Sequence, residues 1–130
     1  MKTTARIPLP VIQTEDCACD GRTLARLVQP AILAALAQSE AHGYMIVHRL
    51  SEMPMYCGHT PDTTGVYRFL RQMERKGLVS SEWEASAAGP AKRLYRITDE
   101  GRGCLRRWVK TLTEYRNAIE SLLEFTRDAG

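Results

Sequence analysis

No apolar run in this sequence approaches the roughly 20 residues that a helix needs to cross a lipid bilayer. The four cysteines are too few for a disulfide scaffold in a chain of 130 residues, so we expect reduced thiols in a cytoplasmic protein without a membrane partner. The formal net charge of +3 excludes a bulk polycation. We find no phosphate-cradling glycine motif, nucleophile elbow or paired-carboxylate site, and therefore do not expect an enzyme.

What the sequence does contain is an ordinary globular composition, 44% hydrophobic and 25% charged, over a length typical of one folded domain. Residues 1–20 carry prolines and polar residues without a period, which predicts an extended arm. A helical pattern covers residues 30–38, where Pro30 suits the first turn. After a short turn, a second helical pattern covers residues 43–53 and stops before Pro54.

A third helical pattern begins at Asp62 or Thr63, since either side chain can accept the free amide hydrogens of a first turn. Gly77 supplies the left-handed stop at its other end. Two strand patterns follow, over residues 78–84 and 92–98, joined by a turn that contains glycine and proline. Three short helices followed by a hairpin predict a winged helix-turn-helix.

The last part of the chain predicts one long helix, capped by Thr98 and running nearly to Asp128. Its apolar residues alternate at spacings of three and four, as in a coiled-coil seam, and a second copy is needed to cover the far end. The fold class is therefore mainly α with a small β-hairpin: an arm (1–20), a winged helix-turn-helix (21–98) and a C-terminal dimerisation helix (99–130). The predicted dimer interface is Leu105, Trp108, Leu112, Tyr115, Ile119 and Leu122.

The third helix presents one polar face. Val66, Leu70 and Met73 form its buried side, which leaves hydroxyl and arginine side chains on the opposite side at helical spacing. Such a face could be an ordinary solvated surface, but the hairpin that follows projects Lys92 and Arg93, which can reach phosphates. A polar helix face followed by a basic wing predicts double-stranded DNA as the partner.

The order of these motifs resembles the PadR family of transcriptional regulators over about residues 28–123. The matching stretches are His42-Gly43-Tyr44, Val66-Tyr67-Arg68-Phe69-Leu70-Arg71, Glu74-Arg75-Lys76-Gly77-Leu78-Val79, Ser81-Glu82-Trp83, Gly89-Pro90-Ala91-Lys92-Arg93 and Tyr95-Arg96-Ile97-Thr98-Asp99-Glu100-Gly101. The resemblance implies a homodimeric repressor of a palindromic operator, released or tightened by an unknown effector. The chain is most similar to the subgroup with an N-terminal Cys-x-Cys arm, some members of which are called polyhydroxybutyrate-responsive.

Carried over by position, the resemblance also implies the residues that contact DNA. One departure concerns the third helix, where the family usually has glycine before a hydroxyl residue and this chain has Thr64 before Gly65. A phosphate-contacting hydroxyl is therefore expected one position earlier. Tyr44 has a second interpretation, as a core residue with a satisfied hydroxyl. The implied contacts are Tyr44, Thr63, Thr64, Tyr67, Arg68, Arg71, Lys92 and Arg93.

Four residues raise a separate hypothesis of a metal- or redox-sensing regulator. Cys17, Cys19, Cys57 and His59 offer three thiolates and an imidazole, which is a ligand set for tetrahedral zinc. The site forms only if the arm lies beside the loop before the third helix. The alternative is separate reduced thiols and a surface histidine, in which case DNA binding requires no cofactor.

The two tryptophans, Trp83 and Trp108, are expected to pack against other parts of the protein. Trp108 either packs across a two-fold axis or lines a slot for a flat apolar effector at the dimer interface. Trp83, in the first strand of the hairpin, is expected to cover the core.

The competing function is a protein-interaction module that does not bind DNA. A steep dependence of DNA binding on salt would separate the two functions.

Overall fold

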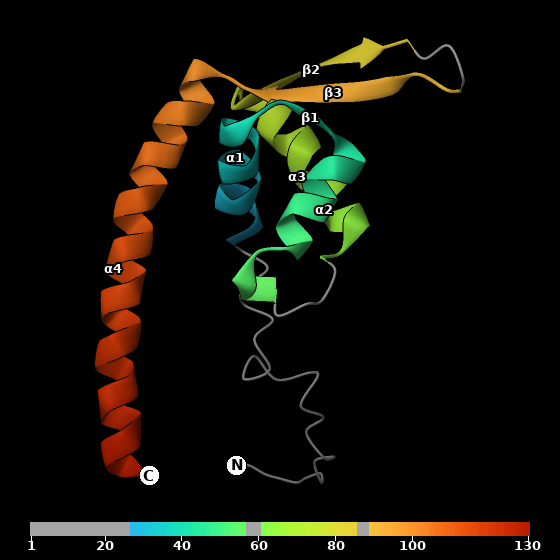
Figure 1. Ribbon diagram of the computed structural model, residues 1–130. Coiled ribbons are helices and arrows are strands. Elements are labelled where there is room, and N and C mark those ends of the chain that lie inside the picture. The colour runs from blue at the N-terminus through green and yellow to red at the C-terminus, as the bar shows by residue number, and fades with distance from the viewer. Residues whose placement is uncertain (1–26, 57–60, 86–88) are drawn as a thin grey trace, which may run out of the picture.

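The computed structural model describes residues 27–56, 61–85 and 89–130, so the predicted arm lies outside the described residues. In Figure 1 the short helices lie below a small sheet, and the long C-terminal helix runs along the side of this domain. The elements are α1 (Val28–Gln38), β1 (Ala41–His42), α2 (Gly43–Ser51), the 3-10 turn η4 (Pro54–Tyr56), α3 (Thr63–Arg75), β2 (Val79–Glu84), β3 (Lys92–Ile97) and α4 (Asp99–Ala129).

The first two helices differ from their predicted bounds at the ends governed by proline. Helix α1 begins at Val28, two residues before the predicted start, and Pro30 stands in its first turn, where its lack of an amide hydrogen costs nothing. Helix α2 ends at Ser51 rather than residue 53. Proline disfavours helical backbone in the residue before it, and the chain instead forms η4 from Pro54 onward.

Both ends of α3 follow the chemistry expected from the sequence. The Asp62 carboxylate accepts a hydrogen bond from the Gly65 amide at 3.2 Å, so Asp62 rather than Thr63 is the N-cap. At the other end Gly77 has φ +78°, a backbone conformation that glycine adopts without strain. The chain reverses there, and the Leu78 amide donates to the Met73 carbonyl at 2.9 Å.

The sheet contains a strand that the sequence analysis missed. Strands β2 and β3 form the predicted antiparallel hairpin, and β1 adds a third strand to the other edge of β3, giving the order β1-β3-β2. Ala41 pairs with Tyr95 and His42 with Leu94. A strand of two residues is too short to show the alternation of apolar and polar side chains, so the sequence did not predict it. Its consequence is that the start of α2 is fixed beside the wing.

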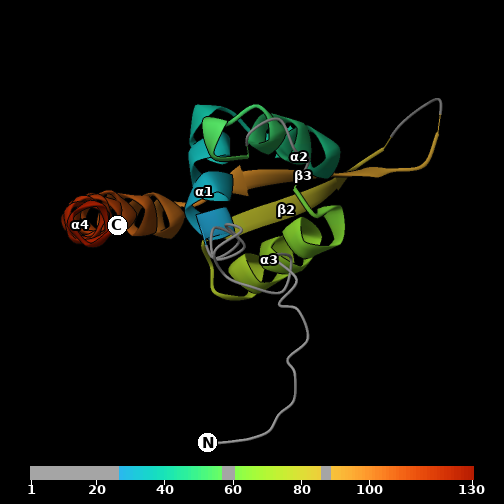
Figure 2. The same cartoon turned by 90° about the horizontal axis from the view of Figure 1, so that it is seen from below.

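The core lies between the sheet and helices α1, α2 and α3. Figure 2 shows these helices grouped around β2 and β3, seen from below. Its largest fully buried side chains come from all three helices and from β2. Trp83 does not cover this core, contrary to expectation: its side chain is 65% exposed, and the residue lies near the outer end of β2. The largest fully buried side chains are Ile32, Leu33, Leu36, Ile46, Leu50, Leu70, Met73, Val66 and Val79.

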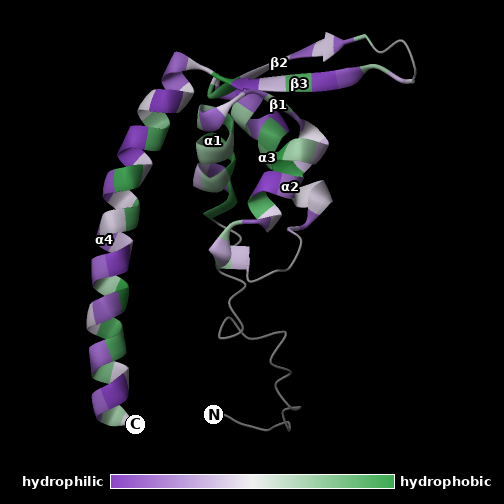
Figure 3. Cartoon of the chain, viewed as in Figure 1, coloured by the Kyte–Doolittle hydropathy of each residue, from purple (hydrophilic) through white to green (hydrophobic). Residues whose placement is uncertain are grey.

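Helix α4 is anchored at its start and unsupported at its end. The Thr98 hydroxyl accepts from the Gly101 amide at 3.0 Å and donates to the Gly77 carbonyl at 2.6 Å, which confirms the predicted cap and ties α4 to the end of α3. Leu105 and Trp108 pack against the core. Figure 3 shows apolar positions recurring along the rest of the helix, where no other described element covers them. None of the described helices is long and apolar enough to span a membrane.

Candidate nucleic-acid interface

Helix α3 exposes the polar face predicted from the sequence. Its apolar side, Val66, Leu70 and Met73, is buried in the core. Because α3 is held by this side, its other face points to solvent along the length of the helix. The four predicted contact residues on this exposed face are Thr63, Thr64, Arg68 and Arg71.

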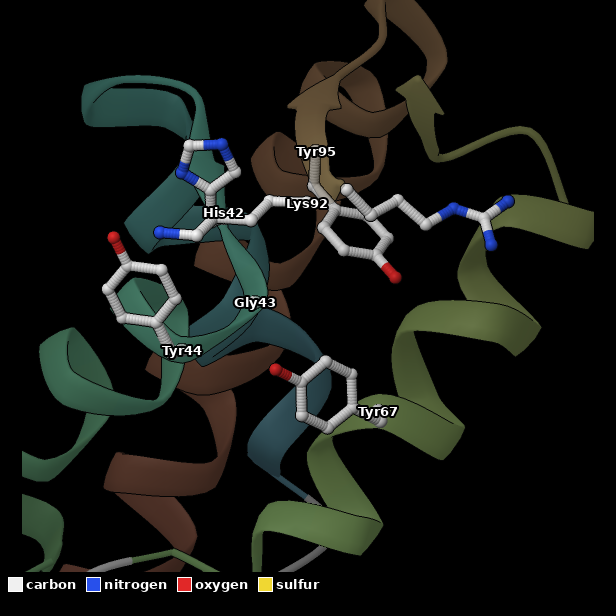
Figure 4. Close-up of a pocket in the computed structure, with 7 residues that line it drawn as sticks. His42, Gly43, Tyr44, Tyr67, Lys92 and Tyr95 are labelled. Carbon is white, nitrogen blue, oxygen red and sulfur yellow. The ribbon is translucent and has the colours of Figure 1, made fainter. Parts of the chain in front are cut away.

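The other four predicted contact residues, which come from three different elements, line one shared pocket of about 150 Å³. Tyr44 belongs to the first turn of α2, Tyr67 to α3, and Lys92 and Arg93 to β3. None of the described residues that line the pocket is acidic. Figure 4 shows the tyrosine rings gathered around Gly43. The complete lining is His42, Gly43, Tyr44, Tyr67, Lys92, Arg93 and Tyr95.

Tyr44 stands at the mouth of this pocket rather than in the core. Its side chain is 54% exposed, so the interpretation of Tyr44 as a core residue is wrong. One face of its ring lies parallel to the His42 ring, with 5.9 Å between centroids. The Lys92 ammonium lies 5.2 Å from the centre of the Tyr44 ring, within range of a cation–π contact. This contact holds the lysine charge beside a phenol hydroxyl, a pair of donors suited to an anion.

Tyr95 forms the inner wall of the pocket. It lies on β3, and its residue is buried. Burial raises the pKa of the Tyr95 phenol, and the Arg93 guanidinium lowers it by a smaller amount. The phenol therefore stays protonated and remains a hydrogen-bond donor at neutral pH.

Tyr67 packs against the start of α2, in space that is open because residue 43 is glycine and has no side chain. A β-carbon added to Gly43 would collide with the Tyr67 ring and would lie 2.5 Å from its hydroxyl oxygen. Gly43 is buried in the first turn of α2, so the helix cannot easily move aside. Glycine at this position therefore allows the close approach of α2 and α3 that creates the pocket.

Replacing Gly43 with alanine is expected to expel the Tyr67 ring from the pocket and to destabilise the fold by about 1–3 kcal/mol, the usual cost of overpacking. DNA affinity should fall further in Gly43→Ala than in Tyr67→Phe, which keeps the ring and removes only the hydroxyl. Thermal unfolding and a DNA titration of both variants test this. If Gly43→Ala binds DNA as tightly as wild type, the packing of Tyr67 on Gly43 does not shape the interface.

Arg93 differs from Lys92 because its side chain turns inward along the sheet. Its Nε donates to the Ser81 hydroxyl at 2.8 Å, and its guanidinium lies 3.7 Å from the Glu74 carboxylate. The same guanidinium lies 5.2 Å from the centre of the Trp83 ring. The Arg93 side chain therefore contacts three other side chains of the same protein.

His42 is a member of the site that the sequence analysis did not assign. Its Nε2 lies 2.9 Å from the Glu84 carboxylate, which joins β1 to the outer end of β2. Its position just before Gly43 and Tyr44 was visible in the sequence. The contact with Glu84 was not, because it depends on the pairing of β1 with β3.

The metal hypothesis rests on residues outside the described part of the chain: Cys17, Cys19, Cys57 and His59. Within the described ranges, no group of three or more histidine, cysteine or acidic side chains could hold a metal ion. Cys104 is half-buried beside the core at the start of α4. The zinc or redox site remains a hypothesis from the sequence.

Residues 32–107 match the profile of the transcriptional regulator PadR-like family. The chain belongs to the PadR-like family. Over 79 residues it is 33% identical to "Probable transcriptional regulator Rv1176c" of Mycobacterium tuberculosis, an alignment covering 61% of this chain and 41% of that protein. The chain thus spans less than half the length of this relative. The family that matches is one of transcriptional regulators.

Solved structures share the fold of this PadR-family chain. TA0346 from Thermoplasma acidophilum, a candidate transcriptional regulator, has 29% identity and a TM-score of 0.69, covering 79% of this chain and 96% of that one. Bacillus subtilis PadR, solved in complex with operator DNA, has 23% identity and a TM-score of 0.57, covering 64% of this chain and 46% of that one. The second likeness concerns the fold alone.

Proposed function

We propose that this PadR-family chain is a homodimeric repressor that binds a two-fold symmetric operator in double-stranded DNA. The observation that carries the proposal is the pocket between α2, α3 and β3, because it joins the polar helix face to the basic wing without an acidic residue in its lining. The fold shared with Bacillus subtilis PadR, whose structure contains operator DNA, supports the same partner. A regulator of this kind acts on the chromosome, so we place it in the cytoplasm.

The two parts of the surface have different roles in this proposal. Arg68 and Arg71 enter the major groove, where an arginine can fork to a guanine edge. Thr63 and Thr64, at the start of α3, donate to backbone phosphates beside the free amide hydrogens of the helix. The pocket seats one further phosphate between Lys92 and the tyrosine hydroxyls.

The exposed apolar stripe of α4 supports the homodimer. Ile119 is 57% and Leu122 62% exposed, and Tyr115 on the same stripe is half-exposed. Leu105, Trp108 and Leu112 continue the stripe towards the domain, where they are half-buried. A second copy of α4 would remove these side chains from water and would present two α3 helices to successive major grooves, about 34 Å apart along DNA. An effector beside Trp108 would act by changing this spacing.

The proposal predicts that removal of Arg68 and removal of Lys92 weaken DNA binding in different ways. Arg68→Ala is expected to weaken operator binding by about 1–3 kcal/mol and to relax the base preference at one position in each half-site. Lys92→Ala should weaken binding to all duplexes alike and reduce the slope of log affinity against log salt by about 0.9 per protomer. Titrations of an operator and an unrelated duplex at several salt concentrations measure both effects. A double variant with unchanged operator affinity would remove this surface from DNA binding.

Footprinting on the DNA upstream of the protein's own coding region tests the whole proposal. The expected result is a protected site with two-fold symmetry, and reporter expression that rises when the protein is deleted. Repeating the footprint with and without zinc, and with and without reductant, tests the hypothesis for Cys17, Cys19, Cys57 and His59. DNA binding that is weak, salt-insensitive and without sequence preference would favour the protein-interaction module instead.

A further inference from the structure

Three polar side chains from three elements form a closed network between the wing strands and the last turn of α3. Arg93 on β3 donates through Nε to the Ser81 hydroxyl on β2 at 2.8 Å. The Ser81 hydroxyl donates to the Glu74 carboxylate on α3 at 2.7 Å. The Arg93 guanidinium completes the triangle at 3.7 Å from the other Glu74 oxygen. Each member therefore contacts both of the others, which joins the two wing strands to the last turn of α3.

The surroundings of this network favour a fixed geometry. Its two hydrogen bonds are both part-buried, and the side chains of Arg93 and Glu74 are 41% and 30% exposed. Charge-assisted hydrogen bonds of this kind are shorter and stronger than neutral ones. The Trp83 ring packs over the guanidinium from β2 and limits its movement further.

The neighbouring residue on β3 shows the contrast. Lys92 is exposed, and its ammonium lies over the Tyr44 ring in the pocket. Arg93 instead contacts Ser81 on β2 and Glu74 on α3. One of these two adjacent cations is thus presented to a ligand, whereas the other is neutralised by a carboxylate of its own chain.

We propose that Arg93 is a positioning residue, which sets the angle between the wing and α3 through Ser81 and Glu74 instead of binding a DNA phosphate. The inference rests on the proposed DNA binding, and it changes the role that the family resemblance implies for Arg93. Glu74 then contributes to DNA affinity although its charge repels phosphate. The wing must be held in one orientation for Lys92 and α3 to contact the same duplex, and the network supplies that constraint.

The decisive test is the direction in which Glu74→Ala changes DNA affinity. Removing a carboxylate from a DNA-binding domain should tighten binding if only charge matters, whereas loss of positioning should weaken it by about tenfold, as for a lost charge-assisted hydrogen bond. Ser81→Ala changes no charge and should weaken binding by about fivefold. The probe is a duplex enriched by the wild-type protein from a random-sequence library. Tighter binding by Glu74→Ala overturns the proposal.

Arg93→Lys separates a positioning residue from a phosphate contact. Lysine keeps the charge but lacks the planar fork that reaches Ser81 and Glu74 together, so affinity should fall about tenfold with an unchanged salt slope. The matched control is Arg96→Lys on the same strand, where the arginine pairs with exposed Glu40 and Glu82 and binding should stay within about twofold. Wild-type affinity in Arg93→Lys overturns the proposal.

Two further measurements test the proposal: the DNA affinity of a double variant and the hydrogen exchange of the free protein. Glu74→Ala added to Arg93→Lys should cost less than the two single effects combined, since both break the same network. In free protein, Arg93→Lys should speed hydrogen exchange of β2 and β3 amides and leave α1 and α2 unchanged. Unchanged exchange in the strands overturns the positioning role by itself. A wild-type protein that binds no duplex would instead overturn the proposed function.

Discussion

Ile119→Asp is expected to make the proposed homodimer monomeric and to reduce operator affinity by about a hundredfold or more, because the two half-sites would no longer be bound by linked domains. Ile119 lies on the exposed apolar stripe of α4, in phase with Leu112 and Leu122. In a symmetric dimer the substitution places two carboxylates in an apolar interface, where an unpaired charge is costly. Sedimentation or light scattering reports the mass, and a DNA titration reports the affinity.

Asn117→Asp is the matched control for this experiment. It adds the same charge on the same helix, but residue 117 is exposed and two positions from Ile119, which is about 200° around an α-helix. The control should remain dimeric and should bind DNA with at most a small loss. Unfolding curves of both proteins show whether the winged domain is intact. A dimeric Ile119→Asp protein would mean that another surface joins the subunits.

Gly101→Ala is expected to lower the free energy of unfolding by about 2–4 kcal/mol, at or above the usual cost of an overpacked site. A β-carbon at residue 101 would collide with the Leu78 carbonyl oxygen and would lie 2.8 Å from Ile97 Cγ1. The carbonyl cannot turn away freely, since it accepts the Thr98 amide at 3.1 Å. The substitution therefore forces apart the start of α4 and the segment that leads from α3 into β2. Thermal and denaturant unfolding measure the loss.

Gly103→Ala, two residues later on the same helix, should have the opposite sign. A β-carbon there meets only the flexible ends of Arg106 and Arg107, at 3.6 Å and 3.7 Å. Alanine then contributes its higher helix propensity, about 1 kcal/mol over glycine, and the unfolding temperature should rise. If the two alanine variants change stability alike, helix propensity rather than close packing governs the start of α4.

The elements with strong local signals were those that sequence reasoning located well. Helix α3 has a capping aspartate, three buried apolar positions at helical spacing and a terminal glycine, and each signal concerns neighbours within a few residues. The same holds for Thr98 at the start of α4. Strand β1 was missed because its two residues become a strand only by pairing with β3, about fifty positions later in the chain.

The sequence likewise predicted only those features of the candidate site that depend on neighbouring residues. Residue types indicated which face of α3 is exposed and which cations belong to the wing, since periodicity determines both. They could not show that Lys92 points to Tyr44 while Arg93 points to Glu74, because these contacts join segments distant in sequence. They also suggested that Trp83 is buried, although strand alternation does not reveal where a hairpin extends beyond its core.

By itself, the sequence determined a PadR-family chain with a winged helix-turn-helix and a long amphipathic helix, since the motifs and periods that specify these elements are local. It also predicted that the segment from Asp62 to Thr98 contacts DNA. Only the tertiary structure decided how that segment is held together. The third strand, the tyrosine pocket and the Glu74–Ser81–Arg93 network all arise where distant segments meet, and the direction of a side chain at such a meeting point depends on its neighbours in space.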